Sequence, residues 1–484
     1  MNSIKSLLGG ALQHRYQLLG HLVFATLLVM SVFYVYERVL YIDSAYQVFQ
    51  NLNFGILIND GRYSMFLSQL LPLLLVKMNA PILLVMCAYS VSFILIAYIC
   101  YLLTVYAVKE KNVGLLMLFT VLCMNNTFFH CISETFQLMF FSAFLYAWLK
   151  YEPKSGTLSN VVYYAVLLFA IALCIFIHPI ALFFVLFVLL YYLLCSRFKV
   201  SVKFVVASVL FLLAFILKNI IVQSGHDASF VPSADDLKYA IGHFFQVYSF
   251  KFFAERMLNL YLVPLLLFVV TSVFYLCKKE WIKLLYYVGF ILCFFVMSVV
   301  VYYKGDGSIG MERSFLPLVF FAGLPFVCDV LPCLKHCQDK VFFAVLSLML
   351  VLAFSKIIST SHSYAKRFDT FDEIISLAKE KGEHKLVIGK TFAREMNLEN
   401  WGVGLESLMY SASQNRDFVV SVFVVEDDED FSEDIFDDGQ YYLAVPWWRF
   451  WKISEMNPRY FSLPQTTYKR LIKADGELKI TGLR

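Results

Sequence analysis

The residues most able to do chemistry are charged and polar side chains at the ends of long apolar segments. Asp43 directly follows the first such segment, within Tyr41-Ile42-Asp43, and the next ten residues have apolar positions at helical spacing. A carboxylate next to a membrane needs a reason, because water would solvate it better elsewhere. We therefore predict that Asp43 is a catalytic acid or base.

Glu134 is the second predicted catalytic acid, because it opens a later apolar segment after Ser133. Seven further side chains fall at the same expected membrane surface, and we expect them to bind substrate: Arg62, His178, Lys218, Tyr303, Lys304, Glu312 and Arg313. Acids can take a proton from an acceptor, and cations can hold a leaving phosphate. The set therefore suits a reaction between a lipid phosphate and a polar acceptor.

Simpler roles stay open for each of these residues. Asp43 could be a solvated loop acid, and Glu134 could stabilise a helix N-terminus by about 0.3–1 kcal/mol. His178 could form a backbone-bonded turn, and Lys218 could reach lipid headgroups. Glu312 and Arg313 could form a structural ion pair. Only the convergence of these side chains on one face favours a site.

The elements that must position these residues are membrane helices. Of the 484 residues, 60% are apolar or aromatic and only 16% are charged, whereas a soluble domain is about half apolar and about a quarter charged. The eleven Cys lie in or beside apolar segments, so no disulfide framework is expected. The first apolar segment lacks a small-residue cleavage site and predicts a retained anchor.

A helix needs about 20 apolar residues to cross a bilayer. By that measure we expect about eleven helices, at 16–36, 80–108, 112–129, 133–149, 160–177, 180–195, 204–222, 258–277, 284–303, 314–333 and 341–357. Pro179 divides the long run 160–195 into two antiparallel helices. Lys and Arg gather in alternate loops, which predicts a cytoplasmic N-terminus and an external C-terminus.

We expect a transmembrane domain over residues 1–357 and an external α/β domain over 358–484. Loop 37–79 should carry two helices at the membrane interface, and loop 223–257 should form a cap. In the tail, the pattern predicts a helix at 371–381, strands at 385–389 and 418–425, and an acidic loop at 426–438. The aromatic cluster Trp447–Trp451 suits either a membrane anchor or sugar stacking.

Several kinds of site are not indicated by the sequence. The chain has no phosphate-binding P-loop, no GxSxG or HExxH motif, and no pattern typical of nucleic-acid binding. Cys333, His336 and Cys337 match a metal site poorly. We therefore expect no cofactor, and nothing in the residues supports a divalent metal.

The pattern resembles the GT-C superfamily of glycosyltransferases, which use sugars linked to polyprenyl phosphate and include protein O-mannosyltransferases and lipid A aminoarabinose transferases. The matching features are the early external Asp43, two helices in its loop, the acid Glu134, the His178-Pro179 turn and the Glu312-Arg313…Pro317 helix start. The paired Asp-Glu of several such families is Asp43-Ser44 here, so the use of a metal stays open.

This resemblance implies a multi-pass plasma (inner) membrane enzyme that moves a sugar from a polyprenyl-phosphate donor to a hydroxyl of a glycan, lipid or protein. Asp43 would be the base, Glu134 and His178 would position the substrates, and Arg313 or Lys304 would meet the phosphate. A surface-polysaccharide polymerase or ligase is a rival function, although the external loops hold few arginines. A transporter or flippase is a second rival, although no repeat or central charge pair is evident.

Overall fold

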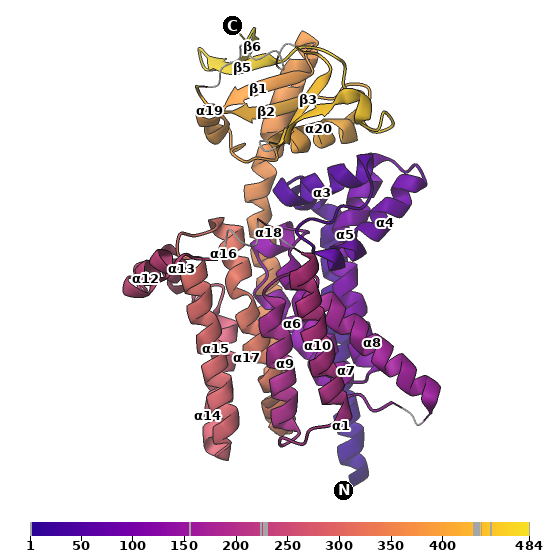
Figure 1. The fold of residues 1–484 in the computed structure, drawn as a ribbon, viewed down its shortest axis with the longest axis vertical. Coiled ribbons are helices and arrows are strands. Elements are labelled where there is room, and N and C mark those ends of the chain that lie inside the picture. Colours follow the sequence, from indigo (N-terminus) through magenta and orange to yellow (C-terminus); the bar gives the residue numbers. More distant parts are fainter. Residues whose placement is uncertain are drawn as a thin grey trace.

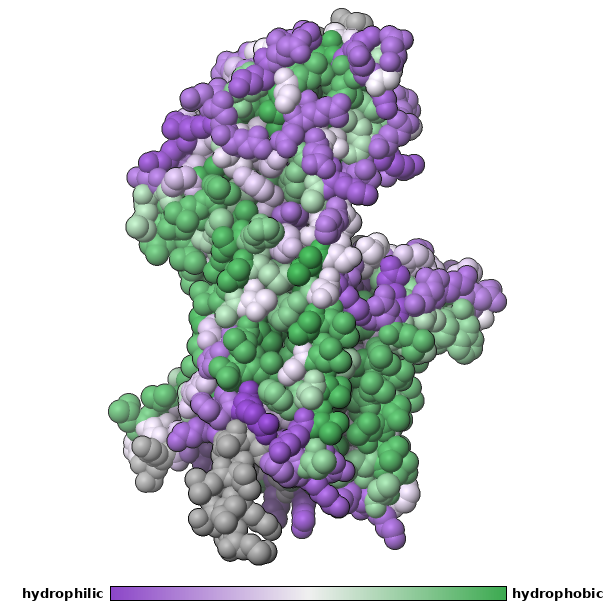
Figure 2. All heavy atoms as spheres, turned by 180° about the vertical axis from the view of Figure 1, so that it is seen from behind, coloured by the Kyte–Doolittle hydropathy of each residue, from purple (hydrophilic) through white to green (hydrophobic). Residues whose placement is uncertain are grey.

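The computed structural model is a helical bundle with a small sheet region at its C-terminal end (Figure 1). It describes residues 2–153, 156–222, 225, 231–428, 436, 438–445 and 448–483. The N-terminus lies at the end of the bundle farthest from the sheet region. Figure 2 shows hydrophobic side chains over much of the bundle and polar side chains over the sheet region.

Seven helical stretches in the described part of the chain are long and apolar enough to span a membrane. They comprise α1 (Asn2–Phe33), α5 (Ile82–Leu102) with the π-helical turn η2 (Leu103–Ala107), α8 (Thr157–Ile175), α10 (Val202–Ile221), α15 (Trp281–Val301), the run from α16 (Gly307–Phe315) through α17 (Pro317–Pro325), η4 (Phe326–Val330) and η5 (Leu331–Cys333), and α18 (His336–Lys381). All seven overlap expected spans.

The four remaining expected spans are shorter helices. They are α6 (Lys111–Leu122), α7 (Glu134–Lys150), α9 (Ala181–Cys195) and α14 (Leu262–Lys278). None reaches 18 residues, and α6 ends seven residues before the expected 129, where the short helix η3 (Asn126–Phe129) follows. Eleven spans therefore stay a prediction.

The first connecting loop folds as expected into two main helices, α3 (Ile42–Asn53) and α4 (Phe66–Lys77), with the short α2 (Val35–Val39) and η1 (Tyr63–Met65) beside them. Side chains three and four residues apart share a face of a helix. On α3, Asp43, Tyr46 and Gln47 face a cavity, whereas Phe49 is fully buried against the C-terminal region. One face of α3 therefore lines the cavity, and another face packs against the C-terminal region.

The second external loop, 223–257, which was expected to form a cap, contains α12 (Ala234–Gly242) and α13 (Tyr248–Arg256). Ser233 caps α12, because its hydroxyl accepts a hydrogen bond from the Asp236 N–H. The histidine at position 226 and the acid at 227 lie outside the described residues.

The C-terminal region is joined to the bundle by a single helix. α18 continues for 46 residues across the expected boundary at 357/358 and includes the helix expected at 371–381. It ends at Gly382, which has a φ of +70°, a conformation that glycine adopts without steric cost.

The main sheet has strand order β2-β1-β5-β6, from β1 (Lys385–Gly389), β2 (Ser421–Val425), β5 (Lys469–Ala474) and β6 (Glu477–Thr481). Strand β1 pairs in parallel with β2, from Lys385↔Ser421 to Gly389↔Val425, and with β5, whereas β5 and β6 are antiparallel. The C-terminal region also contains two helices, α19 (Lys390–Glu395) and α20 (Val403–Gln414). A separate antiparallel hairpin consists of β3 (Tyr441–Val445) and β4 (Trp448–Lys452), and the short helix η6 (Ile453–Glu455) follows it. The expected strand 385–389 is confirmed, and the strand expected at 418–425 begins three residues later.

The sheet region packs onto α3 through aromatic and polar contacts. Trp451 is 2% exposed and stacks on Phe49 with ring centroids 4.7 Å apart, and the Asn457 N–H donates to the Asn53 side-chain oxygen at 2.7 Å. Trp451 is thus part of the core, and the expectation of a membrane anchor or sugar platform is wrong for this residue. Residue 447 and most of the expected acidic loop lie outside the described residues.

Candidate functional site

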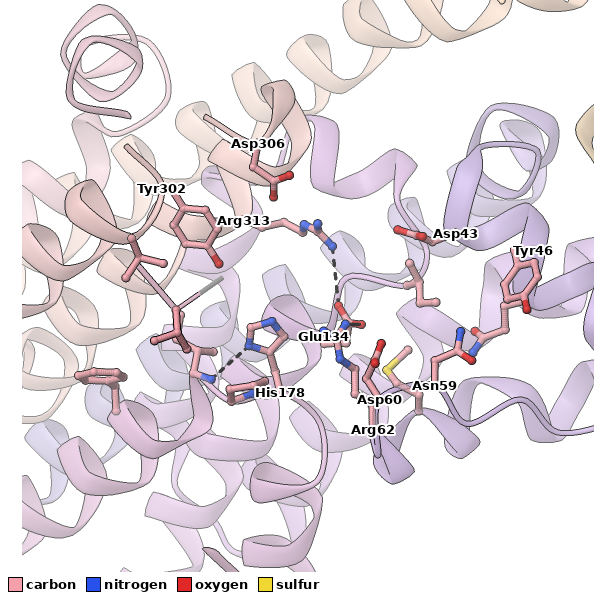
Figure 3. A pocket seen from close by; sticks show the side chains of 18 of the residues that line it. Asp43, Tyr46, Asn59, Asp60, Arg62, Glu134, His178, Tyr302, Asp306 and Arg313 are labelled. Carbon is pink, nitrogen blue, oxygen red and sulfur yellow. Dashed lines mark hydrogen bonds and ion pairs between the residues drawn. The ribbon is translucent and has the colours of Figure 1, made fainter. Parts of the chain in front are cut away.

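A cavity of about 920 Å³ lies where the bundle meets α3 and the C-terminal region. It falls within the range of about 300–1,000 Å³ that is usual for small-molecule sites. Figure 3 shows Asp43 and Tyr46 on one side, Tyr302, Asp306 and Arg313 on the other, and Glu134 between them. Segments that are far apart in the sequence therefore meet here, as the sequence predicted for five of the nine site residues.

Asp43 has its carboxylate open to the cavity, with a side chain that is 45% exposed. The Nε2 atom of the fully buried His130 lies 3.3 Å from Asp43 Oδ2. Partial burial alone would raise the pKa of Asp43, but the hydrogen bond from His130 and the charges of Arg313 and Arg62 outweigh it and lower the pKa below its ordinary value. Asp43 is therefore a carboxylate at neutral pH.

The segment that presents His130 is fixed from two sides. The carboxylate of Glu312 accepts hydrogen bonds at 2.8–2.9 Å from the backbone N–H groups of Asn125, Asn126 and Thr127. Arg38, which is fully buried, donates to the Phe128 carbonyl and packs 4.0 Å over the ring of that residue. These anchors hold residues 125–130 as a rigid turn beside Asp43.

Glu134 joins two arginines from different segments. Its Oε1 lies 2.5 Å from Arg62 Nη1, and its Oε2 lies 3.7 Å from Arg313 Nη1. Because 3.7 Å is too long for a hydrogen bond, Glu134 orients Arg313 without using its donors. The side chain of Arg313 is 25% exposed and makes no hydrogen bond within the described ranges, so its guanidinium can bind an anion in the cavity.

His178 sits at the turn between α8 and α9 and lines the same cavity. Its Nδ1 accepts a hydrogen bond from the Ile180 N–H at 3.2 Å, which agrees with the simpler role of a backbone-bonded turn residue. Burial and the nearby Arg62 charge lower the pKa of His178 to about 3. The imidazole is therefore neutral, and because Nδ1 already accepts a hydrogen bond, its proton lies on Nε2, which can donate a hydrogen bond to a ligand without adding charge.

One wall of the cavity is apolar. It is lined by Ile180 and Phe183 at the start of α9, by Met297 and Val301 at the end of α15, and by Val231 and Pro232. A site with an apolar wall next to charged groups suits an amphipathic molecule that has a hydrocarbon part and an ionic head.

Four predicted substrate-binding residues do not line the cavity, and packing explains each. The Lys218 Nζ donates to the Ile175 carbonyl at 2.9 Å, at the C-terminus of α8, where a positive charge is favourable. Tyr303 and Lys304 contact the Asp236 carboxylate of α12. Glu312 is fully buried against the 125–127 backbone, so the simpler alternative of an ion pair with Arg313 is wrong as well.

Several residues at the site were not predicted from the sequence, among them His130, Asp60 and Trp401. For His130, the only indication in the sequence of a place at the site was its position in the loop before Glu134. Asp60 and Gly61 both have positive φ and form a turn that places Asp60 at the cavity. The Asp-Gly pair in the sequence is typical of such a turn. Trp401 comes from the C-terminal region, and nothing local in its sequence indicates that it reaches the cavity.

The described residues contain no group of three or more His, Cys, Asp or Glu side chains that could hold a metal ion. No protein-family model, curated protein or solved structure matches this chain. The function is therefore inferred from the cavity itself.

Proposed function

We propose that this chain is an integral membrane glycosyltransferase of the GT-C type that moves a sugar from a polyprenyl-phosphate donor to an acceptor hydroxyl, with Asp43 as the base. In this proposal the bundle crosses the plasma (inner) membrane about eleven times. Its N-terminus is cytoplasmic, and the cavity and C-terminal region are external, as the loop charges indicate.

The observation that carries the proposal is the arrangement of Asp43 and Arg313 on opposite sides of one cavity, beside an apolar wall. Asp43 is ionised and partly exposed, so it can accept a proton. Arg313 has donors for a phosphate. The wall of α9 and α15 suits the first isoprene units of a lipid donor.

In the proposed reaction, the acceptor oxygen attacks the anomeric carbon of the sugar while its proton passes to Asp43. The bond between that carbon and the phosphate oxygen breaks, and polyprenyl phosphate leaves with an additional negative charge. Arg313, oriented by Glu134, stabilises that charge where it develops. Neutral His178 hydrogen-bonds to donor or acceptor without weakening the field of the arginines. No step requires a metal ion.

A membrane assay with radiolabelled polyprenyl-phosphate sugars tests this proposal. Because a general base typically contributes about 10²–10⁴-fold, Asp43→Asn should lower transfer by about that factor while the protein remains in the membrane. Asp369→Asn is the matched control, since Asp369 is exposed on α18 and remote from the cavity lining. Near-normal transfer by Asp43→Asn would overturn the assignment of the base.

The same assay separates this reaction from the rival functions. A transporter or flippase would move the lipid-linked sugar across vesicles without breaking the bond to phosphate. A polymerase or ligase would release polyprenyl diphosphate or transfer a whole glycan. Release of polyprenyl monophosphate together with transfer of one sugar is the result expected here.

A further inference from the structure

The side of the cavity that carries Asp43 has the features of a second binding subsite. Tyr46, from α3, and Trp401, from the turn before α20, both line it, with ring centroids 6.2 Å apart and planes at 73°. The amides of Gln47 and Asn59 and the carboxylate of Asp60 line the cavity too. None of these residues has a part in the proposed binding of the donor.

We propose that Tyr46, Gln47, Asn59 and Trp401 form the acceptor subsite and that the acceptor is a neutral carbohydrate. This inference rests on the proposed function and names the class of its second substrate. Aromatic faces pack against the C–H faces of sugar rings, and side-chain amides and carboxylates bind pairs of neighbouring hydroxyls.

The geometry of this subsite supports a rigid platform. The Tyr89 hydroxyl donates to Gln47 Oε1 at 2.5 Å and fixes the orientation of that amide. The Asn400 side-chain oxygen accepts a hydrogen bond from the Gly402 N–H at 2.7 Å and fixes the turn that carries Trp401. The Asp43 carboxylate lies on the same side of the cavity (Figure 3), so it can take the proton from an acceptor hydroxyl that is bound there.

The charges and backbone around this subsite argue against acceptors of different chemistry. Asp43 would repel a phosphate acceptor, and Arg313 lies on the opposite side of the cavity. Extended peptides are commonly bound along an open strand edge, but the described residues that line this side belong to helices and loops. A neutral polyhydroxylated group fits both observations.

Two measurements on full-length protein in detergent or nanodiscs test the proposal. The first is saturation-transfer NMR with a panel of neutral oligosaccharides that covers common hexoses, pentoses and N-acetylhexosamines. The second compares sugar transfer to those oligosaccharides with hydrolysis of the donor by water. The variants are Trp401→Leu and Trp401→Phe, and Trp281→Leu is the control because Trp281 is exposed at the start of α15, away from the cavity.

We expect Trp401→Leu to raise the KM for the oligosaccharide about tenfold, which corresponds to the loss of one good contact, and to lower transfer to the oligosaccharide more than hydrolysis of the donor. Trp401→Phe should retain most of the binding, and Trp281→Leu all of it. Absence of oligosaccharide binding, equal binding by Trp401→Leu, or preferred transfer to Ser/Thr peptides or phosphorylated lipids would overturn this proposal. Oligosaccharide binding without any turnover of donor would instead overturn the proposed function alone.

Discussion

The side chain of Glu406, in the C-terminal region, accepts a hydrogen bond from the backbone N–H of Ile42 at 2.7 Å, one residue before Asp43. Ile42 has a φ of +36°, which is a strained conformation for a β-branched residue. Glu406 is fully buried and ion-paired with Arg367, which lies over the ring of Tyr41. The C-terminal region therefore holds the first turn of α3 and the position of Asp43.

Replacing Glu406 should affect catalysis through this contact. Glu406→Leu removes the acceptor for the Ile42 N–H and leaves Arg367 buried without its partner, whereas Glu406→Gln retains an acceptor oxygen. A hydrogen bond to a charged group contributes about 1.5–3 kcal/mol, so kcat should fall about 10–100-fold in the Leu variant and less in the Gln variant. Steady-state kinetics of purified protein measure both.

The control for that pair is Glu399→Gln, because Glu399 forms an exposed ion pair with Arg394. Limited proteolysis checks that the C-terminal region stays folded. If the Gln and Leu variants lose the same activity, Glu406 acts on the stability of the region and not on the position of Asp43.

Glu312 is predicted to act through the turn that carries His130. Glu312→Gln keeps the size of the side chain but replaces one acceptor oxygen with an NH₂ group that faces backbone N–H donors. An unsatisfied buried donor costs about 1–3 kcal/mol, so we expect a lower Tm and a lower kcat. A role in donor binding would instead raise the KM for the donor with no change in Tm.

The two arginines should depend on Glu134. Glu134→Gln removes the negative charge between Arg62 and Arg313, so the arginines repel each other and Arg313 loses its orientation. We expect a loss of about tenfold or more in kcat/KM for the donor, and Arg313→Lys should lose a similar amount because lysine lacks the planar fork. The control is Arg459→Lys on the surface of the C-terminal region. Full activity in Glu134→Gln would contradict this role.

Hydropathy and loop charge predicted where helices lie and which of their ends share a surface, and this was enough to group Asp43, Arg62, Glu134, His178 and Arg313. The orientation of each side chain about its helix was not predictable. Glu312 and Arg313 are adjacent, yet one points into the turn at 125–127 and the other into the cavity.

Contacts between α3 and the C-terminal region could not be predicted from the sequence either. The reach of Trp401 to Tyr46 depends on the packing of the C-terminal region on α3, through pairs such as Phe49 and Trp451. The partners in these pairs are about 350 residues or more apart, and no local pattern records them. Tertiary packing sets these positions.

The pH dependence of transfer should be flat through the neutral range. The folded-state pKa of Asp43 is lowered, so its carboxylate and the stability it contributes are present above its unfolded pKa of about 3.9 and are lost as pH falls through the folded value. His178, with a pKa of about 3, stays neutral above pH 5. Rates measured from pH 5 to 8 should therefore show no step assignable to either residue. A step that disappears in His178→Asn would show that the imidazole titrates in this range.

The orientation of the bundle can be tested with the native cysteines. Cys333 and Cys337 are exposed and flank the turn before α18, which the proposed topology places in the cytoplasm. Glu477 is exposed on β6, in the region proposed to be external. A membrane-impermeant maleimide added to spheroplasts should therefore label Glu477→Cys but not the wild type. In inverted vesicles the wild type should be labelled more strongly than Cys333→Ser/Cys337→Ser, whose remaining signal comes from the exposed Cys195 and Cys277 at the same end of the bundle. Labelling of the wild type in intact spheroplasts that is weaker in the double serine variant would reverse the topology and place Asp43 on the cytoplasmic side.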